Sequence, residues 1–136
     1  MHQQLCGKVL LAEDNEINTE IALRLLEGFG LRADHARDGV EAVELFSSSL
    51  PGAYAAVLMD IQMPLANGYE ATRAIRGLDR PDAASVPIIA MTADAFADDI
   101  RRCLDAGMNG HVAKPIDPKL LYDTLAGVLP PDGGQT

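Results

Sequence analysis

Acidic, hydroxyl and basic side chains stand directly after the short apolar runs of this sequence. The residues with this placement are Glu13, Asp14, Asp60, Thr92 and Lys114. Carboxylates held close together raise one another's pKa, and a hard divalent cation such as Mg2+ relieves that conflict because it prefers carboxylate, carbonyl and water oxygens. A carboxylate beside such a cation can attack phosphorus, while an ammonium and a hydroxyl neutralise the phosphoryl oxygens. These residue types therefore indicate phosphoryl-transfer chemistry, provided that the fold brings them together.

Each of these residues taken alone has an ordinary explanation. A carboxylate after a strand is commonly a turn residue or a helix cap, and Lys114 followed by Pro115 is a common surface dipeptide. A threonine after a strand, such as Thr92, is equally ordinary. The joint pattern is not ordinary, because the residues follow four different apolar runs. We therefore treat them as one candidate site.

The apolar runs alternate with segments of helical periodicity, which predicts β-α-β units and a parallel sheet. The predicted strands are residues 8–12, 31–36, 55–59, 87–91 and 110–113. The predicted helices are residues 17–29, 40–46, 69–77, 96–106 and 118–128. Five strands and five helices in strict alternation make a doubly wound α/β fold. Ligands of such folds bind beyond the carboxyl ends of the strands, which is where the candidate residues stand.

Individual elements carry further information. The first predicted helix has apolar residues at four-residue steps from Ile17 to Phe29, and glycines at 28 and 30 end it. The strand at 31–36 mixes apolar and charged residues, so we predict that it lies at an edge of the sheet. The run at 55–59 is continuously apolar, and we predict a central strand that ends at Asp60.

Composition indicates one globular domain of 136 residues with 48% hydrophobic residues. The net charge of -9, from 20 acidic and 11 basic residues, disfavours nucleic acid as a direct partner. No apolar run is long enough to span a bilayer, and the first four residues lack signal-peptide character, so we expect a cytoplasmic location without direct membrane contact. Two cysteines are too few for a metal cage, and Cys103 is predicted to be a buried hydrophobe.

Several motifs resemble the receiver domain of bacterial response regulators and hybrid histidine kinases over residues 8–128. They are LLAEDNEIN at 10–18, MDIQMP at 59–64, Gly68, IAMTA at 89–93, and Lys114 with Pro115. The resemblance implies a flavodoxin-like fold with strand order 2-1-3-4-5 and five helices. Residues 1–7 would be an N-terminal extension, 8–129 the receiver domain and 130–136, rich in Pro and Gly, a disordered tail. The first two motifs look most like receivers of bacterial hybrid sensor kinases, which take part in multistep relays.

The family's roles carry over to matching positions. Asp60 would be the phosphoacceptor, taking the group from a phosphohistidine of a histidine kinase or histidine phosphotransfer domain and catalysing its own phosphorylation and dephosphorylation. Mg2+, for which Mn2+ could substitute, would be bound by Asp14, Asp60, the backbone carbonyl of Gln62 and, mainly through water, Glu13. Thr92 would be the switch hydroxyl. Lys114 would bind phosphate, aimed by a cis bond to Pro115.

The chain departs from the family pattern at several positions. His111 stands where the family usually has Tyr or Phe, which leaves open whether it is a switch residue or a partly buried histidine without a signalling role. Leu65 to Gly68 replace a segment that usually carries Met and Asp before the glycine, although Asn67 can support the turn. Asp94 adds charge near the acceptor. We predict that Gln62 and Asp94 set the lifetime of the phosphorylated state.

Three other hypotheses are alternatives to a phosphoacceptor function. A Mg2+-dependent aspartyl phosphatase of the haloacid dehalogenase type needs a second Asp two residues after its nucleophile, where this chain has Gln62. A flavodoxin-like FMN carrier would have its phosphate repelled by Glu13 and Asp14. A degenerate receiver that acts only as an interaction module would not need the complete set of site residues that this chain has.

Overall fold

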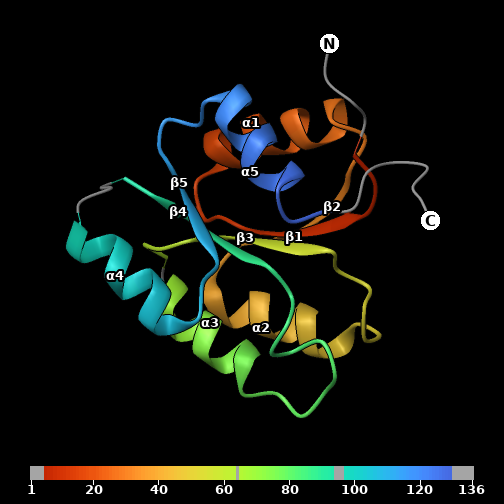
Figure 1. Cartoon of the computed structure of the whole chain (residues 1–136), viewed down its shortest axis with the longest axis vertical. Coiled ribbons are helices and arrows are strands. Elements are labelled where there is room, and N and C mark those ends of the chain that lie inside the picture. The colour runs from red at the N-terminus through yellow and green to blue at the C-terminus, as the bar shows by residue number, and fades with distance from the viewer. Residues whose placement is uncertain (1–4, 64, 94–96, 130–136) are drawn as a thin grey trace.

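The computed structural model describes residues 5–63, 65–93 and 97–129, which form one parallel sheet between two layers of helices (Figure 1). The strands are β1 (Lys8–Ala12), β2 (Arg32–Ala36), β3 (Ala56–Asp60), β4 (Ile88–Thr92) and β5 (Gly110–Ala113). The helices are α1 (Glu16–Gly28), α2 (Gly39–Ser48), α3 (Gly68–Arg76), α4 (Ala97–Ala106) and α5 (Pro118–Ala126). The sheet order β2-β1-β3-β4-β5 confirms the flavodoxin-like prediction.

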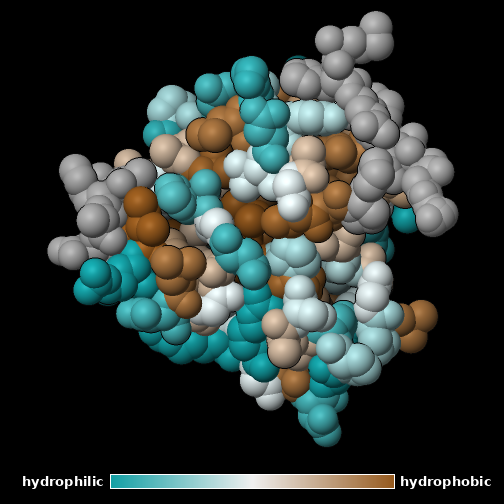
Figure 2. All heavy atoms as spheres, in the orientation of Figure 1, coloured by the Kyte–Doolittle hydropathy of each residue, from teal (hydrophilic) through white to brown (hydrophobic). Residues whose placement is uncertain are grey.

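The core consists of two hydrophobic layers, one on each face of the sheet. Successive residues of a strand point to opposite faces, so Val57 and Met59 pack under α2, α3 and α4 while Leu58 packs under α1 and α5. Every residue of β3 and β4 is buried, as the continuous apolar run of β3 predicted. Figure 2 shows hydrophobic side chains between the α1 and α5 layer and the sheet. β2 lies at an edge and is only partly buried, which confirms that prediction.

Polar side chains cap the first turns of the helices. Asn15 accepts a hydrogen bond from the Asn18 N–H at 2.9 Å at the start of α1, and Asn67 forms a capping box with Glu70 at the start of α3. Asp38 starts α2 in the same way. These caps satisfy backbone N–H groups in the first turns of the helices that follow β1, β2 and β3.

The four-residue repeat in α1 identifies the helix but not its buried face. The buried residues are Thr19, Ala22 and Leu26, whereas Ile17 is 70% exposed and Ile21 is 45% exposed. A four-residue step advances about 40° beyond a full turn, so apolar residues at that spacing wind around the helix instead of following one face. Gly28 is the last residue of α1, and Gly30, with φ +95°, turns the chain toward β2, so the two glycines end the helix as predicted.

Other sequence predictions concern the ends of the chain and single residues. Leu5, within the predicted N-terminal extension, is buried, and its N–H donates to the Phe29 carbonyl at 2.7 Å. Cys103 is buried, as predicted. The predicted tail at 130–136, Asp94 and the predicted helix start at Phe96 lie outside the described residues. Among the helices that are described, none has the length and apolar character needed to cross a membrane.

Candidate functional site

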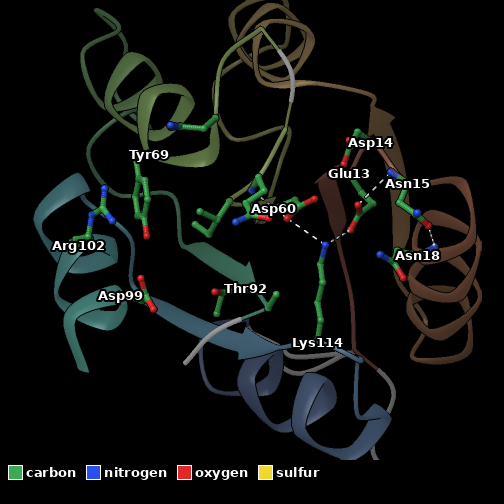
Figure 3. Close-up of a pocket in the computed structure, with 14 residues that line it drawn as sticks. Glu13, Asp14, Asn15, Asn18, Asp60, Tyr69, Thr92, Asp99, Arg102 and Lys114 are labelled. Carbon is green, nitrogen blue, oxygen red and sulfur yellow. Dashed lines mark hydrogen bonds and ion pairs between the residues drawn. The ribbon is translucent and has the colours of Figure 1, made fainter. Parts of the chain in front are cut away.

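A cavity of about 430 Å³ opens at the carboxyl ends of the central strands (Figure 3). Its lining includes all five residues that stand after apolar runs, together with Gln62. Glu13 and Asp14 follow β1, Asp60 ends β3, Thr92 ends β4 and Lys114 follows β5. Because the strands are parallel, their carboxyl ends meet at one edge of the sheet, and residues far apart in the chain converge there.

Three carboxylates lie close together in this cavity. One oxygen each from Glu13, Asp14 and Asp60 fall within 4.8 Å of one another. Glu13 is 1% exposed and Asp60 is 3% exposed, whereas Asp14 is exposed at the mouth of the cavity. Two of the three negative charges are therefore removed from water.

Lys114 extends between the two buried carboxylates (Figure 3). Its Nζ lies 3.0 Å from Glu13 Oε1 and 3.1 Å from Asp60 Oδ1. The Lys114 N–H donates to the Thr92 carbonyl at 2.8 Å, which fixes the backbone from which the side chain extends. The bond from Lys114 to Pro115 is cis, as the resemblance implied.

The electrostatics of this group are unbalanced. Burial, and then the neighbouring Glu13 carboxylate, raise the pKa of Asp60 from 3.8 to about 7, while Lys114 opposes the shift. Burial acts to lower the pKa of Lys114, but the Glu13 and Asp60 carboxylates raise it above its ordinary value. One ammonium beside three carboxylates leaves an excess of negative charge, which a divalent cation would neutralise.

The donor set fits Mg2+. Glu13 Oε1 is buried and, although it pairs with the Lys114 ammonium at 3.0 Å, it has no directed hydrogen bond from the residues that the structure describes. Such an oxygen can accept from a metal-bound water. Asp14 and Asp60 offer carboxylate oxygens, the ligand type that Mg2+ prefers. The Gln62 N–H donates to Asp60 Oδ1 at 3.3 Å, so Gln62 stands beside the acceptor, as its predicted role requires.

Gly68 sets the close approach of α3 to the end of β3. A Cβ at this position would lie 2.4 Å from the Asp60 carbonyl oxygen and 2.9 Å from the Ile61 Cα. The Gly68 N–H donates to the Ile61 carbonyl at 2.9 Å. Only glycine allows this contact, so Gly68 holds the Asp60 backbone in place from the opposite side of the loop.

Several residues that line the cavity were not predicted from the sequence. Asn18 of α1, Tyr69 of α3, and Asp99 and Arg102 of α4 face it (Figure 3). The Arg102 guanidinium lies over the Tyr69 ring at 5.2 Å from its centroid. Asn18 ends the LLAEDNEIN motif, but the motif gave it no role, and no motif marks the other three, which reach the cavity from helix faces. His111 lies on β5 beside Ala90 and is not among the described residues of the lining.

The model of the response regulator receiver domain family matches residues 9–126. Hybrid signal transduction histidine kinase I of Dictyostelium discoideum is 41% identical over 125 residues, which are 90% of this chain and 7% of that protein. The peroxide stress-activated histidine kinase mak1 of Schizosaccharomyces pombe is 38% identical over 122 residues, 89% of this chain and 7% of that protein. This chain thus spans under a tenth of the length of these relatives. Since both are eukaryotic, a bacterial source stays a prediction.

Two solved structures bear on the site. The receiver domain of the sensor histidine kinase PA1611 from Pseudomonas aeruginosa, with a magnesium ion coordinated in its active site cleft, is 38% identical with a TM-score of 0.81, over 90% of this chain and 98% of that one. The receiver domain of Ssk1 from Saccharomyces cerevisiae, in complex with the histidine phosphotransfer protein Ypd1, gives 30% identity and a TM-score of 0.81, over 92% of this chain and 90% of that one.

Proposed function

Because the chain belongs to the response regulator receiver domain family of two-component signalling, we propose that Asp60 accepts a phosphoryl group from a phosphohistidine, with Mg2+ bound beside it. The observation that supports this most is the placement of Asp60. It is a buried carboxylate, 3.1 Å from the Lys114 ammonium, inside a cluster of three carboxylates. Phosphoryl transfer depends on positioning and charge neutralisation, and this arrangement offers both.

The proposed reaction assigns a role to each group. An Asp60 carboxylate oxygen forms the bond to phosphorus while the bond from phosphorus to the histidine nitrogen breaks, and the imidazole leaves. Lys114 neutralises one phosphoryl oxygen, and the Thr92 hydroxyl donates to another. Mg2+, held by Asp14, Asp60, the Gln62 carbonyl and, through water, Glu13, supplies further positive charge when bound. Gln62 beside the acceptor then influences how water reaches the phosphorylated state, as does Asp94, which lies outside the described residues.

The partner in this proposal is a histidine kinase or a histidine phosphotransfer domain. The Ssk1 receiver domain forms a complex with such a phosphotransfer protein, Ypd1. In this chain α1 begins at the cavity, where Asn15 and Asn18 line it, and carries the exposed apolar residues Ile17 and Ile21. These side chains would dock a helical partner whose histidine reaches Asp60. The acidic balance, with a net charge of -9, argues against nucleic acid as a direct partner.

Phosphorylation would also change the conformation of the domain. A phosphoryl group on Asp60 offers strong acceptor oxygens to Thr92, which is buried at the adjacent strand end. Movement of Thr92 toward Asp60 would repack α4, which follows β4 in the chain, and His111 on β5 would follow. A structure with beryllofluoride on Asp60 tests this coupling, which fails if Thr92 and α4 keep their positions.

The phosphoacceptor function itself is tested by mixing the protein with a phosphorylated histidine phosphotransfer domain. We expect the label to move to this chain with Mg2+ present and to stay on the donor when a chelator removes the metal. Transfer that proceeds equally without divalent metal would contradict the proposed role of the carboxylate cluster. An interaction module without phosphoacceptor chemistry would bind the donor and leave its label in place.

A further inference from the structure

His35 of the edge strand β2 is bonded to the backbone of the acidic pair. Its Nε2 lies 2.7 Å from the Glu13 carbonyl oxygen. A carbonyl oxygen can only accept, so Nε2 carries the hydrogen of this bond. The Glu13 N–H donates to the Ala36 carbonyl at 3.0 Å. Both backbone groups of Glu13 are therefore held by β2, one through the main chain and one through the His35 side chain.

Thr19 of α1 completes the network around His35. Its hydroxyl, buried within the fold, donates to the Asn15 carbonyl at 2.8 Å. The same oxygen lies 3.3 Å from His35 Nε2, where its lone pairs can accept. The imidazole thus links β2, the turn after β1 and the first turn of α1. All of these contacts converge on the short segment that carries two of the three clustered carboxylates.

The Glu13 side chain and the peptide unit after it are held by several contacts. Glu13 Oε2 accepts from the Asn15 N–H at 3.1 Å, and Glu13 Oε1 pairs with Lys114 at 3.0 Å. The Glu13 carbonyl belongs to the peptide unit that joins Glu13 to Asp14. Rotation of that peptide unit would turn the Asp14 carboxylate relative to Asp60. A hydrogen bond to this carbonyl therefore fixes the spacing of the carboxylate oxygens.

We infer that His35 is a positioning residue for the divalent cation of this site, acting through the peptide unit between Glu13 and Asp14. The inference rests on the proposed function, because it concerns the same Mg2+ site. Partners outside the ligand set orient the ligands of a metal, and their loss lowers affinity. His35 contacts neither the clustered carboxylate oxygens nor the phosphoacceptor in any contact that the structure describes.

A purely structural role for His35 is the alternative. Buried carbonyl groups are nearly always paired, and the imidazole could serve only to pair this one. The two roles differ in what a substitution changes. A structural bond lowers the stability of the fold and leaves the affinity for Mg2+ unchanged, whereas a positioning bond changes the affinity in protein that remains folded. His35 also borders a hollow of about 450 Å³ on the far side of Asp14, which gives a substituted side chain room to relax.

The test compares Mg2+ titrations of wild type, His35→Leu and His35→Gln, followed by amide chemical shifts. Leu has a similar size but no donor, while the Gln amide can still donate to the Glu13 carbonyl. We expect His35→Leu to weaken Mg2+ binding about tenfold, the low end of the effect of losing an outer partner of a metal site, and His35→Gln to recover most of the loss. Without metal, the Asn15 amide should exchange faster in His35→Leu, since its bond to Glu13 Oε2 loosens.

Asp34→Asn is the matched control. It alters the neighbouring position of β2, where Asp34 pairs with Lys8 at 3.1 Å and accepts from the Tyr54 hydroxyl at 2.7 Å on the opposite face of the sheet. Its Mg2+ affinity should equal that of wild type. If His35→Leu binds Mg2+ as wild type does, the inference is overturned and the proposed function stands. If wild type itself does not bind Mg2+, the proposed metal site fails and His35 has no cation to position.

Discussion

Asp60 and Glu13 are buried carboxylates that share one ammonium, with Lys114 Nζ 3.1 Å from Asp60 Oδ1 and 3.0 Å from Glu13 Oε1. One positive charge between two buried negative charges leaves Asp60 easier to protonate than a free carboxyl group. Its pKa is raised to about 7, first by burial and then by Glu13. The site is therefore under electrostatic strain that a cation or a proton relieves.

This strain gives the metal-free protein a characteristic pH dependence. A carboxyl group whose pKa is higher in the folded than in the unfolded protein stabilises the fold fully below its unfolded pKa, and loses that contribution as pH rises through its folded pKa. For Asp60 the contribution is lost over the pH range between the two pKa values, 3.8 and about 7. In chelator, we expect Asp60→Asn to be more stable than wild type above this range, and the difference to shrink as pH falls through it. Urea unfolding at a series of pH values measures the difference in unfolding free energy between the two proteins. A difference that stays the same at every pH would contradict the expected protonation of Asp60.

Gly68→Ala should damage both fold and site. The added methyl group would meet the Asp60 carbonyl oxygen at 2.4 Å, and this oxygen belongs to backbone that cannot easily shift. We expect a loss of about 3 kcal/mol in unfolding free energy, the upper part of the range for forced overpacking. Gly28→Ala is the control, because a Cβ there meets nothing within 4 Å and alanine favours the helix. Equal stability of the two variants in denaturant unfolding would refute the close-contact explanation.

Leu65→Asn should stabilise the protein. Leu65 has φ +70° and is 80% exposed, so it adopts a left-handed conformation with little burial to offset the steric cost. Asparagine tolerates this region better, and we expect a gain of about 1 kcal/mol. Leu50 is 79% exposed without a positive φ, so Leu50→Asn should change stability little. Thermal unfolding of both variants measures the effect, and no difference between them would mean that the backbone conformation carries no cost.

Ile17→Glu should slow transfer from a protein donor. Ile17 is 70% exposed on α1 next to the cavity, where the proposed partner docks. We expect about a tenfold loss in the rate of transfer from a histidine phosphotransfer domain, the effect of losing one central apolar contact. Phosphorylation by acetyl phosphate, which needs no docking surface, should be unchanged. Leu50→Glu, which changes an exposed leucine just after α2, is the control. If Ile17→Glu and Leu50→Glu transfer equally well, α1 is not the docking surface.

Much of the fold and the centre of the site could be predicted from the sequence, because both follow from the strands. Apolar runs mark the strands, and parallel strands bring their carboxyl ends to one edge, so Asp60 and Lys114 could be grouped without knowing any contact. The buried face of α1 could not be predicted, since the apolar residues that begin at Ile17 recur every four residues, a spacing that winds around the helix. The bond from His35 to the Glu13 carbonyl and the placement of Arg102 depend on side-chain packing between remote elements, which no local pattern encodes.

The most direct measurement is to identify the residue that carries the phosphoryl group. The protein would be labelled by a phosphorylated histidine phosphotransfer domain with Mg2+ and then treated with borohydride, which reduces an aspartyl phosphate to homoserine and releases the phosphate. Peptide mass spectrometry then locates the homoserine. Asp60→Asn, whose amide is a poor nucleophile of nearly the same size, provides the control. We expect homoserine at position 60 alone in wild type, and no label on folded Asp60→Asn before reduction. Undiminished labelling of Asp60→Asn, or reduction at another carboxylate such as Asp14, would contradict Asp60 as the phosphoacceptor.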